Sequence, residues 1–141
     1  MLPDFSATLQ AFCAQADMLR LAYLDRQGYP RVVPVWFVLL EGAYYFGTGA
    51  HSPKWRAMQR QARVGWVVDG GPRDAYKGAS LCGSVSEVRD TVLRARVYEA
   101  LGNKYFHTPE HPRFTEIFGR LDDPATVYLQ LTPTTGRVWE Y

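Results

Sequence analysis

The spacing of apolar residues along the chain predicts short strands joined by tight turns. Apolar runs at residues 18–25, 31–40 and 43–48 follow one another, with only short turn segments such as RQGYP between them. Because these segments are too short for a crossover helix, neighbouring strands are expected to pair antiparallel. Residues Val32–Leu40 are apolar on both faces, which predicts a central strand covered on both sides, with a bulge or pairing gap at Pro34.

The second half of the chain continues the same pattern. RVGWVVD is typical of a further strand, and residues 78–88 alternate between apolar and small polar side chains, as in a half-buried strand. Gly83 interrupts that alternation and predicts a bulge. The chain closes with TVYLQL and RVWEY, which a Pro-Thr-Thr-Gly turn is expected to join.

Helical patterns are inserted between these strands. They are expected over residues 4–16, 52–62, 91–106 (capped by Asp90) and His111–Phe118. The resulting division is one domain over residues 1–141, with an N-terminal helix in 1–16 and a helical insertion in 90–119. Because a closed barrel removes exposed strand edges, the predicted fold is mainly β: a six- to seven-stranded antiparallel barrel with inserted helices.

Composition narrows the functional classes. A chain of 141 residues with 47% apolar content suits one hydrophobic core, and a net charge of +2 does not indicate a nucleic-acid binder. No apolar run approaches the roughly 20 residues of a membrane span. The N-terminal stretch carries Asp4 and no basic region, so a cytoplasmic protein is expected.

Cys13 and Cys82 match no zinc or redox spacing and are expected to be buried small hydrophobes.

The stretch FGTGAHSPKW contains the most informative chemistry. Ser52 is a preferred helix N-cap, and Pro53 suits the first helical position because it has no N–H to leave unpaired. Lys54 is the unusual choice, since a cation in the first turn opposes the helix dipole by about 0.3 kcal/mol or more. Free N–H groups, a hydroxyl and an ammonium at one helix start are typical of a phosphate site, and Gly47 and Gly49 let the backbone approach a ligand closely.

An ordinary capped helix with a solvated basic face remains the alternative for this region. No carboxylate lies between Glu41 and Asp69, and Arg56, Arg60 and Arg63 share a face that fits surface exposure. The Walker pattern G-x-x-x-x-G-K-[ST] is absent. The spacing of the histidines and nearby carboxylates between residues 107 and 116 matches no zinc pattern, so no metal site is predicted.

In their order and spacing, RVVPVWF, YYFGTG, SPKW, RVGWVVD and GASLCGSVSEV resemble the pyridoxamine 5′-phosphate oxidase-like FMN-binding split-barrel superfamily, over about residues 15–140. The resemblance implies a homodimer with two flavin sites at the subunit interface. It also implies a set of cofactor-binding residues: Arg31, Val32, Val33, Pro34, Val35 and Trp36 beside the flavin ring, with Arg31 reaching the phosphate, and Thr48, Ser52 and Lys54 at the phosphate end.

Two departures from the family pattern matter. Pro53 stands where many relatives carry a first basic residue, so one phosphate partner is lost. The chain ends GRVWEY, where true pyridoxamine phosphate oxidases carry a segment with arginine and histidine that grips the substrate. Vitamin B6 oxidation is therefore not expected.

The favoured function is an FMN-dependent oxidoreductase acting on an unknown small molecule, in which the flavin supplies the redox chemistry and no side chain acts as a catalytic acid or base. Three alternatives stay open. The first is a reductase of the same fold that uses a deazaflavin coenzyme, whose acidic tail Arg56 and Arg60 could bind. The second is a non-enzymatic flavin or cofactor carrier, and the third is a basic module for an acidic partner.

Overall fold

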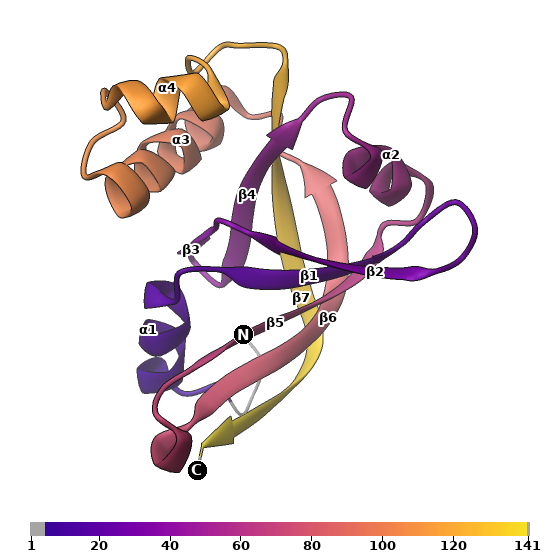
Figure 1. Cartoon of the computed structure of the whole chain (residues 1–141), viewed down its shortest axis with the longest axis vertical. Helices are drawn as coiled ribbons and strands as arrows, with labels where there is room; N and C mark the ends of the chain where they lie inside the picture. Colours follow the sequence, from indigo (N-terminus) through magenta and orange to yellow (C-terminus); the bar gives the residue numbers. More distant parts are fainter. Residues whose placement is uncertain (1–4, 141) are drawn as a thin grey trace.

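Seven strands form one antiparallel sheet in the computed structural model, which describes residues 5–140 (Figure 1). The order across the sheet is β2-β1-β5-β6-β7-β4-β3, so the first and last positions belong to strands that are consecutive in the chain. The strands are β1 (Leu19–Leu24), β2 (Pro30–Val35), β3 (Val38–Leu40), β4 (Ala43–Gly49), β5 (Arg63–Gly70), β6 (Lys77–Glu87) and β7 (Thr126–Glu140).

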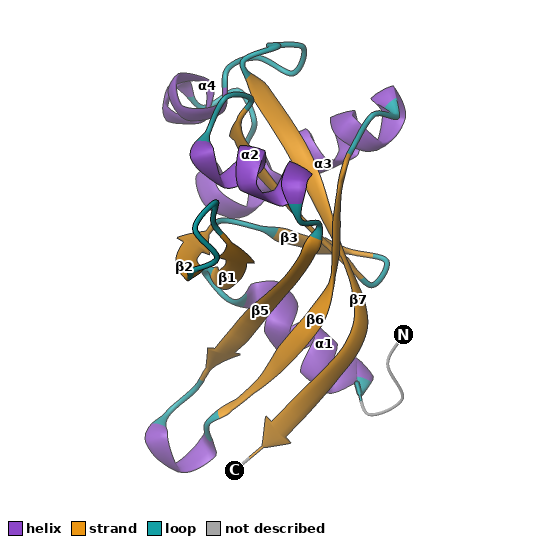
Figure 2. Ribbon diagram, turned by 90° about the vertical axis from the view of Figure 1, so that its right-hand side faces the viewer, coloured by secondary structure: helices purple, strands orange, loops and turns teal. Residues whose placement is uncertain are grey.

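The sheet curls because its two edge strands are tied together by the chain. Only Trp36 and Phe37 separate the end of β2 from the start of β3, although these strands lie at opposite edges of the hydrogen-bonded order. The sheet therefore bends into an open half-barrel: the covalent link joins its two edge strands, and no hydrogen bonds pair β2 with β3. Figure 2 shows β5, β6 and β7 side by side as the longest part of this sheet.

Helices occupy three places around the sheet (Figure 1). Helix α3 contacts β3, β4 and α4, while α2 follows β4 and contacts β1. The helix α1 lies against β3 and β6. Their bounds are α1 (Ala7–Gln15), α2 (Pro53–Arg60), α3 (Thr91–Phe106) and α4 (Pro112–Phe118), with a single 3₁₀ turn, η1 (Arg73–Ala75), before β6.

Alternate residues of β4 divide the hydrophobic core in two. Tyr44 and Phe46 belong to the cluster enclosed by the curled sheet and α1, which also contains Trp66. Ala43 and Tyr45 belong to a second cluster, beneath α3 and α4. This division follows from the strand period of two, because successive side chains of a strand point to opposite faces of the sheet.

Most sequence predictions of elements are confirmed, to within a few residues at their ends. Asp90 caps α3 by accepting the backbone N–H groups of Val92 and Leu93 at 2.8 and 3.3 Å. The predicted irregularity at Gly83 is present as a register shift between Cys82 and Gly83. The N-terminal helix was predicted from Asp4, which lies outside the described residues.

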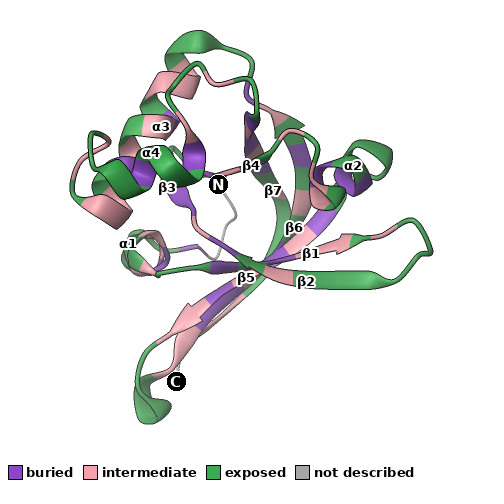
Figure 3. Ribbon diagram, turned by 45° about the horizontal axis from the view of Figure 1, so that its top comes forward, coloured by how far each residue is buried: buried purple, intermediate pink, exposed green. Residues whose placement is uncertain are grey.

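The prediction of one central strand over residues 31–40 is wrong. This segment forms two edge strands, β2 and β3, and Val32 is 65% exposed. Figure 3 shows β2 exposed along most of its length. The predicted bulge at Pro34 is also wrong, because Pro34 pairs with Arg20 in regular register; an edge strand tolerates the missing N–H.

The predicted turn at residues 133–136 is wrong as well. The segment stays extended within β7, and Cys82 pairs with Thr135 while Gly83 pairs with Pro133. Thr134 is therefore the extra residue of a β-bulge, and the residues predicted to form a turn are part of a continuous, bulged strand. Gly83 is required opposite the bulge, since a side chain at this position would overlap the carbonyl of Thr132.

The two cysteines differ in their surroundings. Cys13 is fully buried on α1, as predicted, and burial raises the pKa of its thiol to about 11. The same prediction for Cys82 is wrong: this side chain is exposed on β6, on the polar face of the alternating strand.

Candidate functional site

A cavity of about 570 Å³ opens where β2 ends, β4 ends and α2 begins. These three elements meet because the curled sheet brings the end of edge strand β2 near that of β4, and the chain leaves β4 directly into α2. The cavity is lined by Pro34, Val35, Trp36, Gly47, Thr48, Gly49 and Lys54, together with residues of α4 and the loop that follows it.

The start of α2 and the end of β4 supply two hydroxyls and a cation at one end of the cavity, while Glu116 and Asp123 lie on the wall formed by α4 and its loop. Ser52 caps the helix, since its Oγ accepts the backbone N–H of Trp55 at 3.2 Å. The hydroxyl oxygens of Ser52 and Thr48 lie 3.3 Å apart, so the end of β4 and the start of α2 are joined by a side-chain hydrogen bond. With Pro53 in the first turn, these groups form the helix start that the sequence predicted.

Lys54 is half-buried and faces the cavity. Burial lowers the pKa of its ammonium, and no neighbouring charge contributes to that shift. Within residues 5–140, no carboxylate lies within 4.0 Å of the Lys54 ammonium. A partly desolvated cation without a counter-charge is unfavourable by itself and favours binding of an anion.

The β2 side of the cavity is apolar and aromatic. Pro34, Val35 and Trp36 line it, and the Trp36 ring stacks on Tyr105 of α3 with centroids 4.9 Å apart and planes 16° apart. The ring centroid of Phe118, on α4, lies 6.2 Å from that of Trp36. A flat wall of this kind suits the face of a planar ring system.

The opposite wall was not predicted from the sequence. It comes from α4 and the loop leading into β7, and it contains Thr115, Glu116, Ile117, Phe118, Gly119, Asp123, Ala125 and Thr126. The only available signal was the pair Phe114 and Phe118, which lie one helical turn apart and are both buried. That spacing predicts packing and does not identify the partner.

Arg94 of α3 holds this loop in place. Its Nε donates to the carbonyl of Leu121 at 2.8 Å, and its Nη2 donates to the carbonyls of Asp123 and Thr126 at 3.1 and 3.3 Å. The guanidinium carbon lies 4.8 Å from the ring centroid of Tyr128. One side chain thus satisfies three loop carbonyls and fixes the backbone of the cavity wall.

Of the nine predicted site residues, five line the cavity and Ser52 adjoins it through Thr48. The remaining three, at the start of β2, lie outside it. Arg31 pairs with Asp25 at 2.9 Å, Val32 faces solvent, and Val33 packs against the main core. Their assignment to the cofactor site stays a prediction.

Trp66 has the role of a core residue. It is 2% exposed and packs edge-to-face on Tyr44, with ring centroids 5.6 Å apart. The exposed side chains of Arg56, Arg60 and Arg63 agree with the solvated basic face considered above.

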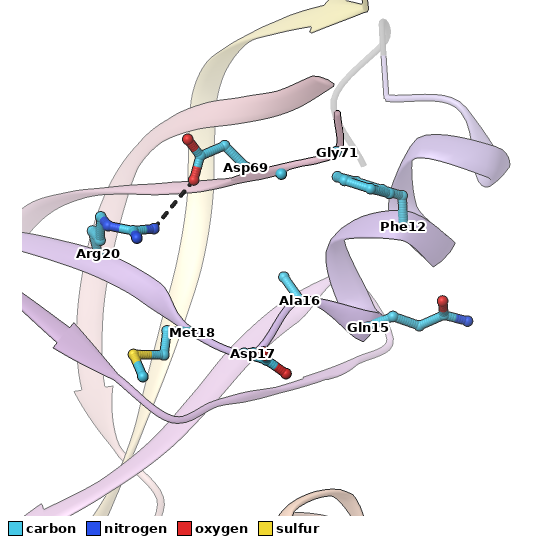
Figure 4. Close-up of a pocket in the computed structure, with 9 residues that line it drawn as sticks. Phe12, Gln15, Ala16, Asp17, Met18, Arg20, Asp69 and Gly71 are labelled. Carbon is cyan, nitrogen blue, oxygen red and sulfur yellow. Dashed lines mark hydrogen bonds and ion pairs between the residues drawn. The ribbon is translucent and has the colours of Figure 1, made fainter. Parts of the chain in front are cut away.

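A second cavity, of about 550 Å³, lies between α1, β1 and the end of β5 (Figure 4). Its polar groups include an ion pair between Arg20 and Asp69 at 3.2 Å, and Phe12 and Met18 supply apolar surface. None of the predicted site residues lies in this cavity.

No group of three or more histidine, cysteine, aspartate or glutamate side chains within residues 5–140 is placed to hold a metal ion. No helix among the same residues has the length and apolarity needed to cross a membrane.

Comparison with known proteins gives a family match and several structural neighbours. The family model described as pyridoxamine 5′-phosphate oxidase matches residues 5–140. No curated protein matches the chain. A conserved hypothetical protein of Mycobacterium tuberculosis has a similar structure, with a TM-score of 0.80 and 21% identity over 96% of this chain and 84% of that one.

Two other solved structures have names that mention cofactors. An FAD-binding protein of Mesorhizobium loti matches with a TM-score of 0.72 and 18% identity over 96% of this chain and 95% of its own. An F420 reductase matches with a TM-score of 0.71 and 20% identity over 96% of this chain and 98% of its own. At these identities the structural matches show the shared fold.

Proposed function

Because the chain belongs to the pyridoxamine 5′-phosphate oxidase family, we propose that it binds FMN in the cavity between β2, β4, α2 and α4 and acts as a flavin-dependent oxidoreductase on a small molecule. The observation that carries the proposal is the half-buried Lys54 ammonium, which has no carboxylate partner among residues 5–140 and lies beside Thr48. The Ser52 hydroxyl and the backbone N–H of Lys54, which has no acceptor in the described part of the chain, complete an anion site.

The remaining walls fit the other parts of a flavin. Pro34, Val35 and Trp36 would hold the ring system, and the α4 wall would exclude water from its other side. When bound, the flavin supplies the hydride chemistry. The protein's own groups bind the phosphate, orient the ring and shape the substrate space, so no side chain is assigned as a catalytic acid or base.

A homodimer would account for the three predicted residues outside the cavity. The β1–β2 hairpin exposes three apolar side chains to solvent: Tyr29 is 66% exposed, Val32 65% and Leu24 42%. A second copy of the chain covering this surface would bury them and bring Arg31, Val32 and Val33 to an interface. A dimer is therefore part of the proposal, and its molecular mass in solution tests it.

A deazaflavin coenzyme is the second candidate, for two reasons. Arg56 and Arg60 are exposed on the same helix as Lys54, outside the cavity lining, and neither pairs with a carboxylate in the described part of the chain. A structural neighbour is named an F420 reductase. A non-enzymatic carrier that binds a flavin without turnover is the third candidate, and the FAD-binding neighbour supports it to the same degree.

Titration with FMN followed by fluorescence quenching tests the proposal. Lys54→Ala is expected to raise the dissociation constant about 10- to 150-fold, the equivalent of one charge-assisted hydrogen bond of about 1.5–3 kcal/mol. Arg60→Ala is the matched control on the same helix and should bind FMN like the wild type. An unchanged constant for Lys54→Ala would remove this cavity as the phosphate site.

Turnover separates the three candidates once binding is measured. NADH or NADPH oxidation with an added acceptor by the FMN-loaded protein supports the oxidoreductase. Tighter binding of a deazaflavin with a glutamate tail, weakened selectively by Arg60→Ala, supports the second candidate. Binding of FMN with no turnover by any donor supports the carrier.

A further inference from the structure

The link between β2 and β3 leaves backbone groups that no strand can satisfy. Trp36 and Phe37 lie outside regular structure, yet Phe37 is fully buried. A buried N–H or carbonyl without a partner costs about 1–3 kcal/mol, so this break in the sheet requires hydrogen bonds from elsewhere.

Two consecutive residues of α3 supply these hydrogen bonds. The backbone N–H of Phe37 donates to the hydroxyl of Tyr105 at 3.0 Å, and Lys104 Nζ donates to the carbonyl of Phe37 at 2.9 Å. The Tyr105 hydroxyl in turn lies 2.7 Å from the carbonyl of Asp17, to which it donates. We call Lys104 and Tyr105 the α3 clamp, because they join the β2–β3 link to the α1–β1 link.

The clamp also holds both side chains of the link. The Tyr105 ring stacks on Trp36, and the Lys104 ammonium lies 3.8 Å from the ring centroid of Phe37. Trp36 lines the proposed cofactor cavity, whereas neither clamp residue does. The position of this aromatic wall therefore depends on side chains that the ligand does not touch.

We propose that Lys104 and Tyr105 are positioning residues for the cofactor cavity: by fixing the Trp36–Phe37 link where the half-barrel is open, they hold the Trp36 ring in the orientation that receives a planar ligand. This inference rests on the proposed function for its ligand and on the clamp geometry for its mechanism. It places a determinant of cofactor affinity on the helical insertion, outside the barrel.

Three variants separate the parts of the clamp. Tyr105→Phe keeps the ring that stacks on Trp36 and removes the hydroxyl. Lys104→Met keeps a similar stem and removes the ammonium, while Lys104→Arg keeps the charge and should restore wild-type behaviour. Tyr76→Phe is the matched control, because Tyr76 packs on Trp139 and its hydroxyl makes no hydrogen bond in the described residues.

Hydrogen exchange at the Phe37 amide and FMN titration are then measured on folded protein. Tyr105→Phe is expected to speed Phe37 exchange and to raise the FMN dissociation constant, each by about three- to tenfold or more, because the Phe37 N–H loses its acceptor and the Asp17 carbonyl loses a donor. Lys104→Met should raise the dissociation constant similarly, and Tyr76→Phe should change neither quantity. A purely structural role would lower the unfolding midpoint and leave FMN affinity unchanged, which would overturn the proposal.

A separate readout distinguishes failure of this inference from failure of the proposed function. In protein labelled with 5-fluorotryptophan, the resonance of Trp36 is assigned by its absence in Trp36→Phe. Should the wild type bind no FMN, the proposed function fails, but a shift of the Trp36 resonance in Tyr105→Phe and Lys104→Met still supports the clamp. An unshifted resonance would overturn the clamp whatever the ligand.

Discussion

Gly47→Ala adds one methyl group to the cavity wall and tests how tightly Phe118 and Tyr128 pack over β4. Gly47 lies in β4 opposite Tyr128 and lines the cavity. A methyl group built on it would lie 2.9 Å from Cε1 of Phe118 and 3.0 Å from Cε1 of Tyr128. Carbon atoms pack at about 3.5–4.0 Å, so at least one aromatic ring must move by about half an ångström or more.

The burial of the two rings decides which one moves and at what cost. Tyr128 is fully buried beneath the guanidinium of Arg94, whereas Phe118 borders the cavity. We therefore expect Phe118 to shift toward the cavity. Overpacking of this kind costs about 1–3 kcal/mol. It outweighs the gain of about 0.4–1 kcal/mol that Gly→Ala brings by restricting the unfolded chain.

Gly49→Ala is the matched control two residues further along the strand. Its added methyl group would meet only Cβ of Ser52, at an ordinary distance of 3.9 Å. The free energy of unfolding of Gly49→Ala should therefore equal that of the wild type or exceed it by up to about 1 kcal/mol. Both glycines have negative φ angles, which alanine accepts.

Equilibrium unfolding in urea measures the difference between these variants. Gly47→Ala should be about 1–3 kcal/mol less stable than Gly49→Ala, which corresponds to about 3–4 °C in midpoint temperature for each kcal/mol in a chain of this size. It should also bind FMN more weakly, because Phe118 would occupy part of the cavity. Equal stabilities of the two variants would refute the described packing of Phe118 and Tyr128 over β4.

Three further predictions concern ionisable groups. Lys54→Met should stabilise the folded protein while weakening FMN binding, because it removes a partly desolvated ammonium; a loss of stability in urea unfolding would contradict this. A thiol reagent at pH 8 should label the exposed Cys82 in the native protein and Cys13 only after unfolding, and rapid labelling of two thiols would contradict the burial of Cys13. Burial lowers the pKa of Lys104 from 10.5 to about 8, so between these pH values the unfolded chain binds more protons and the contribution of Lys104 to stability rises with pH. The stability of the wild type relative to Lys104→Met should therefore increase from pH 8 to pH 10.5, and a constant difference would show that Lys104 has an ordinary pKa.

Much of the candidate site could be predicted from the sequence because its chemistry is local. The cap of α2 is decided within a few residues: Ser52 accepts an N–H three positions ahead, and Pro53 suits the first turn. The unusual place of Lys54 could be recognised from the same stretch. Thr48 reaches Ser52 across four residues of the chain.

Other parts of the site could not be predicted because they depend on distant contacts. Arg94 donates hydrogen bonds to carbonyls 27 to 32 residues further along the chain. The Tyr105 hydroxyl accepts the backbone N–H of Phe37, which lies 68 residues earlier in the sequence. Nothing in the local pattern around either residue identifies these partners. The apolar run over residues 31–40 was misread for the same reason, since apolarity on both faces indicates burial without saying which strands, helices or second copy of the chain provide it.

The sequence by itself determined the strand and helix patterns, the alternation along β6 and the polar start of α2, since each depends on hydrogen bonding and side-chain period within one segment. The tertiary structure decided that β2 and β3 are edge strands joined by a two-residue link, that α4 forms the second wall of the cavity, and that α3 braces both walls. These features arise when a curled sheet brings its own edges together, because closing the sheet sets which distant backbone groups need partners and which side chains can reach them.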